Sequence, residues 1–331
     1  GTFSLISKIL ISKNLEEFIK KNNNFYFYFL TILAYHLIGR HNSRGVKMAF
    51  DYGSQRTPFI ESPFLKKMIN KSEDHSDLLI KLNSDGYCVF DPDIDSELLV
   101  QANADIDASV KKDNFKKNSD AYHYNDSPRI VEAWKNSDAI KKIVTNQNLS
   151  SFLKHAYQSE PIPFSTINFL KGTEQPLHSD EFHFGSIPHR YLTGVWVALE
   201  DIDPDSGPIS IAVGSHKMPI FSFEMLNIET PRNENQFKEA YTIYEEWVRE
   251  YIECQDLKIV TPELKKGQCI IWLSNTLHGS YKIKNNSLTR KSMAIHFHYE
   301  KCEKIFFPSY SNIEKGKFVP RSLTNLDIRA N

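Results

Sequence analysis

The sequence has few cysteines and no charge bias, and both absences narrow its class. Its 331 residues include four cysteines, none arranged as a C-x-x-C pair. We therefore expect neither a disulfide framework nor a cysteine-bound metal, and a reducing, cytoplasmic setting fits best. Lysine and arginine total 40 against 41 aspartate and glutamate, a formal net charge of −1. A general nucleic-acid binder usually carries a strongly basic face, so nucleic acid is not an expected partner.

Long apolar runs are also scarce. Residues 25–38 form a mostly aromatic and aliphatic stretch that follows Lys20 and Lys21. A transmembrane helix needs about 20 apolar residues, more than this run offers. We expect a helix packed on the main domain. A membrane-surface helix and a signal or anchor segment stand as less favoured alternatives.

Composition divides the chain into three parts. We expect an N-terminal helical extension at 1–47, a main domain at 48–310 and a C-terminal tail at 311–331. Met48 offers an alternative natural start, in which case the extension would not be native. A charged and aromatic insert, expected to be helical, interrupts the domain at 218–264. Long excursions from a scaffold either carry substrate contacts or cover it, and the sequence leaves open whether this one is a lid.

Short apolar runs separated by turns indicate that strands dominate from Ser165 onward. Before that point, 97–108 and 133–156 have the apolar spacing of helices, and a strand follows Gly86. Short strands between turns of Gly, Pro, Asp and Asn favour a sandwich or barrel. The predicted class is mainly β with helical support, or α+β. Nothing in the pattern indicates an oligomeric state.

The most informative motif is His178-Ser179-Asp180, followed far downstream by His278 and Arg290. Residues i and i+2 of a strand point to the same face, so an imidazole and a carboxylate would converge. A histidine from a distant strand would complete a two-histidine, one-carboxylate set. That set binds Fe(II) and leaves coordination positions open. Arg290 would then supply a fixed positive charge for a carboxylate.

The order of motifs between Leu79 and Tyr299 resembles the phytanoyl-CoA dioxygenase family. In chain order they are H-x-D at 178–180, W-x-A-L at 196–199, S-G-P-I at 206–209, G-S-H-K at 214–217, H-G-S at 278–280 and R-K-S-M-A-I-H-F at 290–297. The resemblance implies a double-stranded β-helix, a cupin-like jelly roll. It also implies a dioxygenase that uses Fe(II), 2-oxoglutarate and O₂ and releases succinate and CO₂.

The resemblance assigns roles to individual residues. It implies an iron site made of three side chains: His178, Asp180 and His278. It implies a 2-oxoglutarate pocket in which one arginine holds the distal carboxylate and other residues add a contact or a wall: Arg290, Ser280, Trp196 and, as a further candidate from the preceding strand, Asn168. Related halogenases lack the carboxylate ligand, so Asp180 favours hydroxylation.

The expected substrate is a small molecule or lipid-like metabolite with an unactivated C–H bond. Three alternatives remain open: an iron or cupin-type enzyme that does not use 2-oxoglutarate, a non-catalytic jelly-roll binding protein, and a hydroxylase of a protein side chain. Family likeness fixes chemistry better than substrate. Among the other histidines, His183 and His189 are candidates for the substrate mouth. His296 and His298 alternate on the terminal strand and could reach the pocket, and His216 is expected to be structural.

Overall fold

The computed structural model describes residues 57–69, 75–111, 129–229, 231, 234–306, 311–314 and 317–320. The expected extension at 1–47, its apolar run at 25–38 and most of the tail at 311–331 lie outside these residues. Among the described residues, no helix combines the length and apolar character that crossing a bilayer requires.

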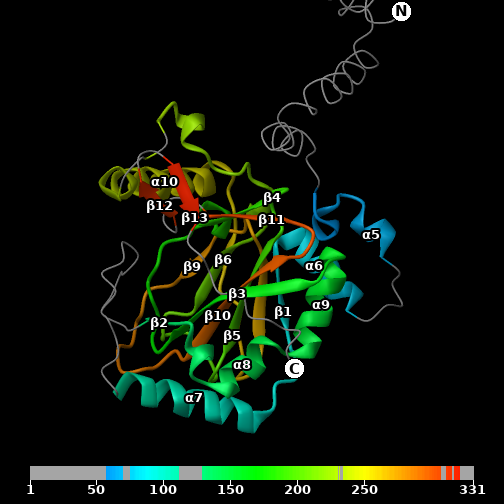
Figure 1. The fold of residues 1–331 in the computed structure, drawn as a ribbon, viewed down its shortest axis with the longest axis vertical. Helices are drawn as coiled ribbons and strands as arrows, with labels where there is room; N and C mark the ends of the chain where they lie inside the picture. Colours follow the sequence, from blue (N-terminus) through cyan, green and yellow to red (C-terminus); the bar gives the residue numbers. More distant parts are fainter. Residues whose placement is uncertain are drawn as a thin grey trace, which may run out of the picture. The chain divides into compact units, whose positions relative to one another are not determined.

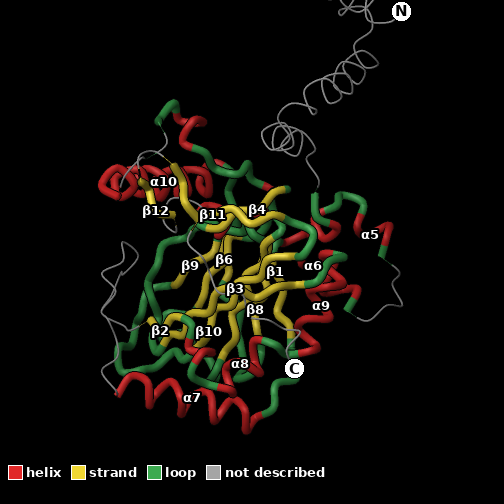
Figure 2. Tube along the Cα trace, in the orientation of Figure 1, coloured by secondary structure: helices red, strands yellow, loops and turns green. Residues whose placement is uncertain are grey.

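Two antiparallel sheets form the core (Figures 1 and 2). The larger has the order β1-β8-β5-β10-β3-β2, with bounds β1 Tyr87–Phe90, β8 Cys269–Leu273, β5 Leu192–Ala198, β10 Ser292–Tyr299, β3 Pro161–Phe169 and β2 Arg129–Val131. The smaller has the order β7-β6-β9, with bounds β7 Ile259–Val260, β6 Ile209–Ala212 and β9 His278–Ser280. Two further pairs are β4 (Phe184–Ile187) with β11 (Glu303–Phe306), and β12 (Ser311–Glu314) with β13 (Lys317–Pro320).

The described helices lie around these sheets. Their bounds are α5 Leu65–Met68, α6 Ser76–Asp85, α7 Ser96–Lys111, α8 Asp138–Val144, α9 Gln147–Tyr157 and α10 Glu234–Cys254. In Figure 1, α7 and α8 lie near one end of the sheets and α10 lies near the other. Helix α10 covers the middle of the insert expected at 218–264, and the short strand β7 lies near the end of the insert.

The larger sheet is buried on both faces. Val195 and Val197 of β5 point into a core shared with α6 to α9. Trp196 and Ala198 point the other way and pack with Ile209 of the smaller sheet. A strand covered on both faces is buried at every position and largely apolar, which explains why β5 has no polar alternation. Facing antiparallel sheets with helical support confirm the predicted α+β, jelly-roll-like class.

One predicted helix is wrong in its extent. The segment 133–156 contains α8 and α9, separated at Thr145 and Asn146, rather than one helix. Each helix begins at a side-chain cap: Ser137 Oγ accepts from Ile140 N at 3.1 Å, and Asn146 Oδ1 accepts from Leu149 N at 2.9 Å. Such caps satisfy amide groups that a helix leaves unbonded, so they favour a new start within a continuous apolar pattern.

Candidate metal centre and adjoining pocket

A short backbone bridge brings the two histidines of the motif together. His178 N donates to His278 O at 2.9 Å, and His278 N donates to His178 O at 3.0 Å. The two imidazole rings lie 4.5 Å apart between centroids. Residues 100 positions apart in sequence therefore meet through strand-type pairing at the start of β9.

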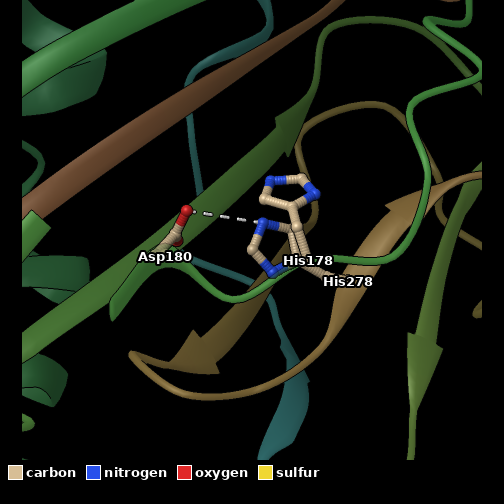
Figure 3. Close-up of side chains that lie close together, drawn as sticks. All are labelled: His178, Asp180 and His278. Carbon is tan, nitrogen blue, oxygen red and sulfur yellow. Dashed lines mark ion pairs between the residues drawn. The ribbon is translucent and has the colours of Figure 1, made fainter. Parts of the chain in front are cut away.

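Asp180 reaches the same point by a different route from the one predicted. The strand expected through the motif ends early, because Asp180 opens a 3-10 helix at Asp180–Phe182. Ser179 remains extended (φ −102°, ψ 135°), and its hydroxyl accepts from Glu181 N at the start of that turn. The extended linker still turns both flanking side chains toward His278, as Figure 3 shows.

The three side chains present their ligand atoms to one another. His178, Asp180 and His278 are buried, and one nitrogen or oxygen atom from each lies within 4.8 Å of the others. Asp180 Oδ1 is 3.6 Å from His278 Nε2, the contact drawn in Figure 3.

Backbone carbonyls determine which imidazole nitrogen is available. His178 Nδ1 lies 2.9 Å from Pro176 O, and His278 Nδ1 lies 2.9 Å from Thr276 O. A carbonyl only accepts hydrogen bonds, so each Nδ1 carries the proton and each Nε2 keeps its lone pair. A hydrogen bond that fixes the ring in this way is the usual support of a metal-binding histidine.

Electrostatics give the triad the charge state of a metal site. Burial lowers the pKa of His278, and burial together with the neighbouring histidines lowers the pKa of His178 well below its ordinary value. Burial opposes ionisation of Asp180, but its interactions with His278 and His296 outweigh burial and hold the pKa of this carboxyl well below its usual range. Two neutral nitrogens and one anionic oxygen result, and that donor set fits Fe(II).

A cavity adjoins the triad, and Arg290 lines it. Arg290 is 2% exposed, and its Nη1 donates to Gly207 O at 2.7 Å and to Ser280 Oγ at 3.0 Å. Its buried Nε has no hydrogen-bond partner. Burial lowers the pKa of Arg290 to about 9, which leaves it charged at neutral pH. An unpaired N–H on a fixed cation fits an anionic group in this cavity.

The other predicted pocket residues are divided between the cavity and the opposite side of the sheet. Ser280 and Trp196 line the cavity, and the Trp196 ring lies 5.3 Å from the Arg290 guanidinium carbon. Asn168 does not line it. Its neighbours Ile167 and Phe169 do, so alternation along β3 directs Asn168 to the other face, where its amide is buried without a hydrogen-bond partner.

Sequence reasoning missed a second cation in the cavity. Arg129 begins the three-residue edge strand β2, and its Nη2 donates to Gln175 Oε1 at 3.2 Å. The guanidinium carbons of Arg129 and Arg290 each lie 5.8 Å from the Phe169 ring. Gln175 Nε2 in turn lies 3.2 Å from His178 Nε2. A lone arginine on a short strand carries no motif, so only the fold brings it here.

The insert supports the metal-binding segment directly. Tyr244 of α10 accepts a hydrogen bond from Ser179 N at 2.7 Å, and its ring stacks on Phe182 at 4.0 Å. Ser179 Oγ donates to Asn275 Oδ1 at 2.9 Å, and Asn275 Nδ2 donates to Met218 O at 2.8 Å. The linker between His178 and Asp180 is thus held from both sides, which indicates a bracing role for the insert.

The remaining histidines differ in whether they line the cavity. His183 and His296 line the cavity, whereas His298 does not, and His296 Nε2 is 3.5 Å from Asp180 Oδ1. His189 Nδ1 instead lies 3.1 Å from Glu181 Oε1, outside the cavity lining. His216 Nε2 lies 3.0 Å from Asn83 O and packs against Gly86, whose φ of +83° ends α6. His216 is therefore structural, as expected.

Comparisons with known proteins agree with this geometry. The family model of phytanoyl-CoA dioxygenase (PhyH) matches residues 82–292. The peroxisomal phytanoyl-CoA dioxygenase of Bos taurus is 26% identical over 147 residues, which are 44% of this chain and 40% of the bovine protein. The match therefore spans about two fifths of the relative's length.

Two solved structures share the fold. The non-heme alpha-ketoglutarate-dependent carbocyclase SnoK from nogalamycin biosynthesis aligns with a TM-score of 0.55 and 12% identity, over 72% of this chain and 87% of SnoK. EctD from S. alaskensis, solved with 2-oxoglutarate and 5-hydroxyectoine, aligns with a TM-score of 0.54 and 16% identity, over 73% of this chain and 81% of EctD. At these identities, the likeness shows the fold alone.

Proposed function

The chain belongs to the phytanoyl-CoA dioxygenase family, and from this premise we propose that it is a non-heme Fe(II)- and 2-oxoglutarate-dependent dioxygenase. We further propose that it hydroxylates an unactivated C–H bond of a small-molecule or lipid-like substrate. One observation carries the proposal: a buried triad with two lone-pair nitrogens and one carboxylate adjoins a cavity that contains a buried arginine with an unpaired N–H.

His178, Asp180 and His278 would hold the iron. When bound, Fe(II) and 2-oxoglutarate supply the oxidising chemistry with O₂ and release succinate and CO₂. Three protein ligands leave room at the metal for both the co-substrate and oxygen. The intact carboxylate of Asp180 supports hydroxylation, because related halogenases lack this ligand.

Arg290 would bind the distal carboxylate of 2-oxoglutarate through its free edge, and Ser280 would hold the guanidinium in place. Trp196 would form a wall that keeps water from this carboxylate. Arg129 adds a second positive charge to the cavity, suited to a dianionic co-substrate. Fe(II) bound by one protein carboxylate would keep a net positive charge, and the dianionic co-substrate would neutralise it.

Substrate-independent turnover tests the reaction class. Purified protein supplied with Fe(II), 2-oxoglutarate and O₂ should form succinate, and Asp180→Ala should abolish that formation. Asp201→Asn is the matched control, because Asp201 is an exposed aspartate that bonds to Lys265 and Lys266 away from the cavity. Equal succinate formation by wild type and Asp180→Ala would refute the metal assignment.

The substrate class needs its own experiment. Candidate acyl and other small metabolites would be incubated under ¹⁸O₂ and followed by mass spectrometry. The expected product carries one labelled oxygen atom and forms in step with succinate. Labelled oxygen on a protein partner, with none on small molecules, would favour protein hydroxylation instead.

A further inference from the structure

The two oxygens of Asp180 have different surroundings. Oδ2 lies 2.8 Å from Trp272 Nε1 and accepts its hydrogen bond. Oδ1 lies 3.6 Å from His278 Nε2 and 3.5 Å from His296 Nε2. One oxygen is thus held by an indole N–H while the other faces the imidazole nitrogens.

The backbone fixes Trp272 firmly. It lies in β8 between β1 and β5, is 2% exposed, and its ring centroid is 4.3 Å from that of His278. Its cross-strand partner on β5 is Gly194. A Cβ atom at Gly194 would lie 2.1 Å from Cε2 and 2.4 Å from Nε1 of the indole. Only glycine at position 194 leaves the space that the indole occupies beside Asp180.

We propose that Trp272 is a positioning residue that makes Asp180 a one-oxygen ligand, and that Gly194 is the residue that makes this placement sterically feasible. The proposal rests on the proposed function, in which Asp180 binds the metal. The indole N–H uses one lone pair of Oδ2 and orients the carboxylate, so that Oδ2 points to the indole and Oδ1 points to the imidazole nitrogens. Oδ1 carries no such bond to the indole and faces the site.

The number of ligand atoms at the metal explains why one-oxygen binding by Asp180 matters. Three protein ligand atoms would leave the iron room for both 2-oxoglutarate and O₂. A second oxygen from Asp180 would occupy part of that room. His296 cannot perform the same task, because it faces Oδ1 rather than Oδ2. Among the described side chains, Trp272 is therefore the one that gives the two oxygens of Asp180 different roles.

Difference infrared spectroscopy of the wild type and Trp272→Phe tests the proposal. The substitution keeps a ring in the core and removes the N–H. With ¹³C-labelled aspartate, Fe(II)-loaded minus metal-free spectra report the separation of the two carboxylate stretches, which is wider for one-oxygen than for two-oxygen binding. We expect a wide separation in the wild type and a narrower one in Trp272→Phe. The Fe(II) dissociation constant is measured alongside, because loss of a partner to a metal ligand typically costs about 10–100-fold in affinity or activity.

Trp134→Phe is the matched control. The indole N–H of Trp134 is buried, has no hydrogen-bond partner and does not line the cavity. This variant should reproduce the wild-type infrared spectrum and Fe(II) affinity. An equal change of the infrared spectrum in Trp272→Phe and Trp134→Phe would overturn the proposal, because the change would then result from the loss of any buried indole.

A measurement on the wild type does not depend on the folding of any variant. With ¹⁵N-labelled indoles and diamagnetic Zn(II), the Trp272 N–H should keep the slow exchange of a buried hydrogen bond after metal binding. Rapid exchange on metal binding would overturn the proposal, and so would two-oxygen binding in the wild type. An absent metal-dependent aspartate signal in the wild type would instead refute the proposed function itself.

Discussion

Replacing Arg290 with lysine should weaken 2-oxoglutarate binding while leaving iron binding almost unchanged. Arg290 Nη1 is occupied by Gly207 O and Ser280 Oγ, whereas its buried Nε has no partner. The edge that contains Nε is therefore the one a carboxylate can meet with two parallel hydrogen bonds. Lysine keeps the positive charge and loses the planar fork.

The magnitude follows from counting these bonds. A hydrogen bond to a charged group contributes roughly 1.5–3 kcal/mol. Lysine can replace one of the two hydrogen bonds that Arg290 would donate to the carboxylate, so the net loss is about one charged hydrogen bond. Since 1.4 kcal/mol is about tenfold in affinity, the dissociation constant of 2-oxoglutarate should rise about 10–100-fold.

The assay is an anaerobic titration of the Fe(II)-loaded variant with 2-oxoglutarate, after an independent Fe(II) titration. Lys291→Gln is the adjacent control, because Lys291 Nζ bonds to Asp107 of α7 at 2.8 Å and does not line the cavity. An unchanged 2-oxoglutarate affinity in Arg290→Lys would refute the assigned role of Arg290. It would favour an iron or cupin-type enzyme that does not use 2-oxoglutarate.

Two further perturbations probe the support of the site. Tyr244→Phe leaves the buried Ser179 N–H without its acceptor, which should lower the unfolding free energy by about 1–3 kcal/mol and weaken Fe(II) binding. Urea denaturation measures the unfolding free energy, and metal titration measures Fe(II) binding. No change in either quantity would refute the bracing role of α10. Burial raises the pKa of Glu61 from 4.5 to about 7, against the opposing attraction of Arg190. The folded state therefore holds a proton that the unfolded chain has released, and this group's contribution to stability falls as pH rises from about 4.5 to about 7. The unfolding free energy of the wild type minus that of Glu61→Gln should fall by about 3 kcal/mol across this window, and a difference that stays constant with pH would contradict the assignment.

Local signals predicted much of the core. The alternation and turn pattern predicted the strand-rich part, although β3 begins at Pro161 rather than at Ser165. The motif residues His178, Asp180 and His278 meet because strand pairing joins distant segments. The strand predicted through Asp180 failed because a Ser179 hydroxyl cap starts a 3-10 turn there.

The support of the site could not be read from the sequence. Trp272 looks like an ordinary apolar strand residue until Gly194 is found opposite it. Tyr244 belongs to an insert whose partner is more than 60 positions away in the chain. Asn168 was assigned to the pocket, but only the register of β3 shows that it faces away. Such pairings depend on tertiary register, which no local pattern encodes.

The central claim is that this triad binds iron beside a 2-oxoglutarate pocket. The most direct test is anaerobic addition of Fe(II) and then 2-oxoglutarate to metal-free protein, followed by visible absorption. We predict a metal-to-ligand charge-transfer band that needs both components and is lost in Asp180→Ala. Folded protein that binds iron and shows no band with 2-oxoglutarate would contradict the account.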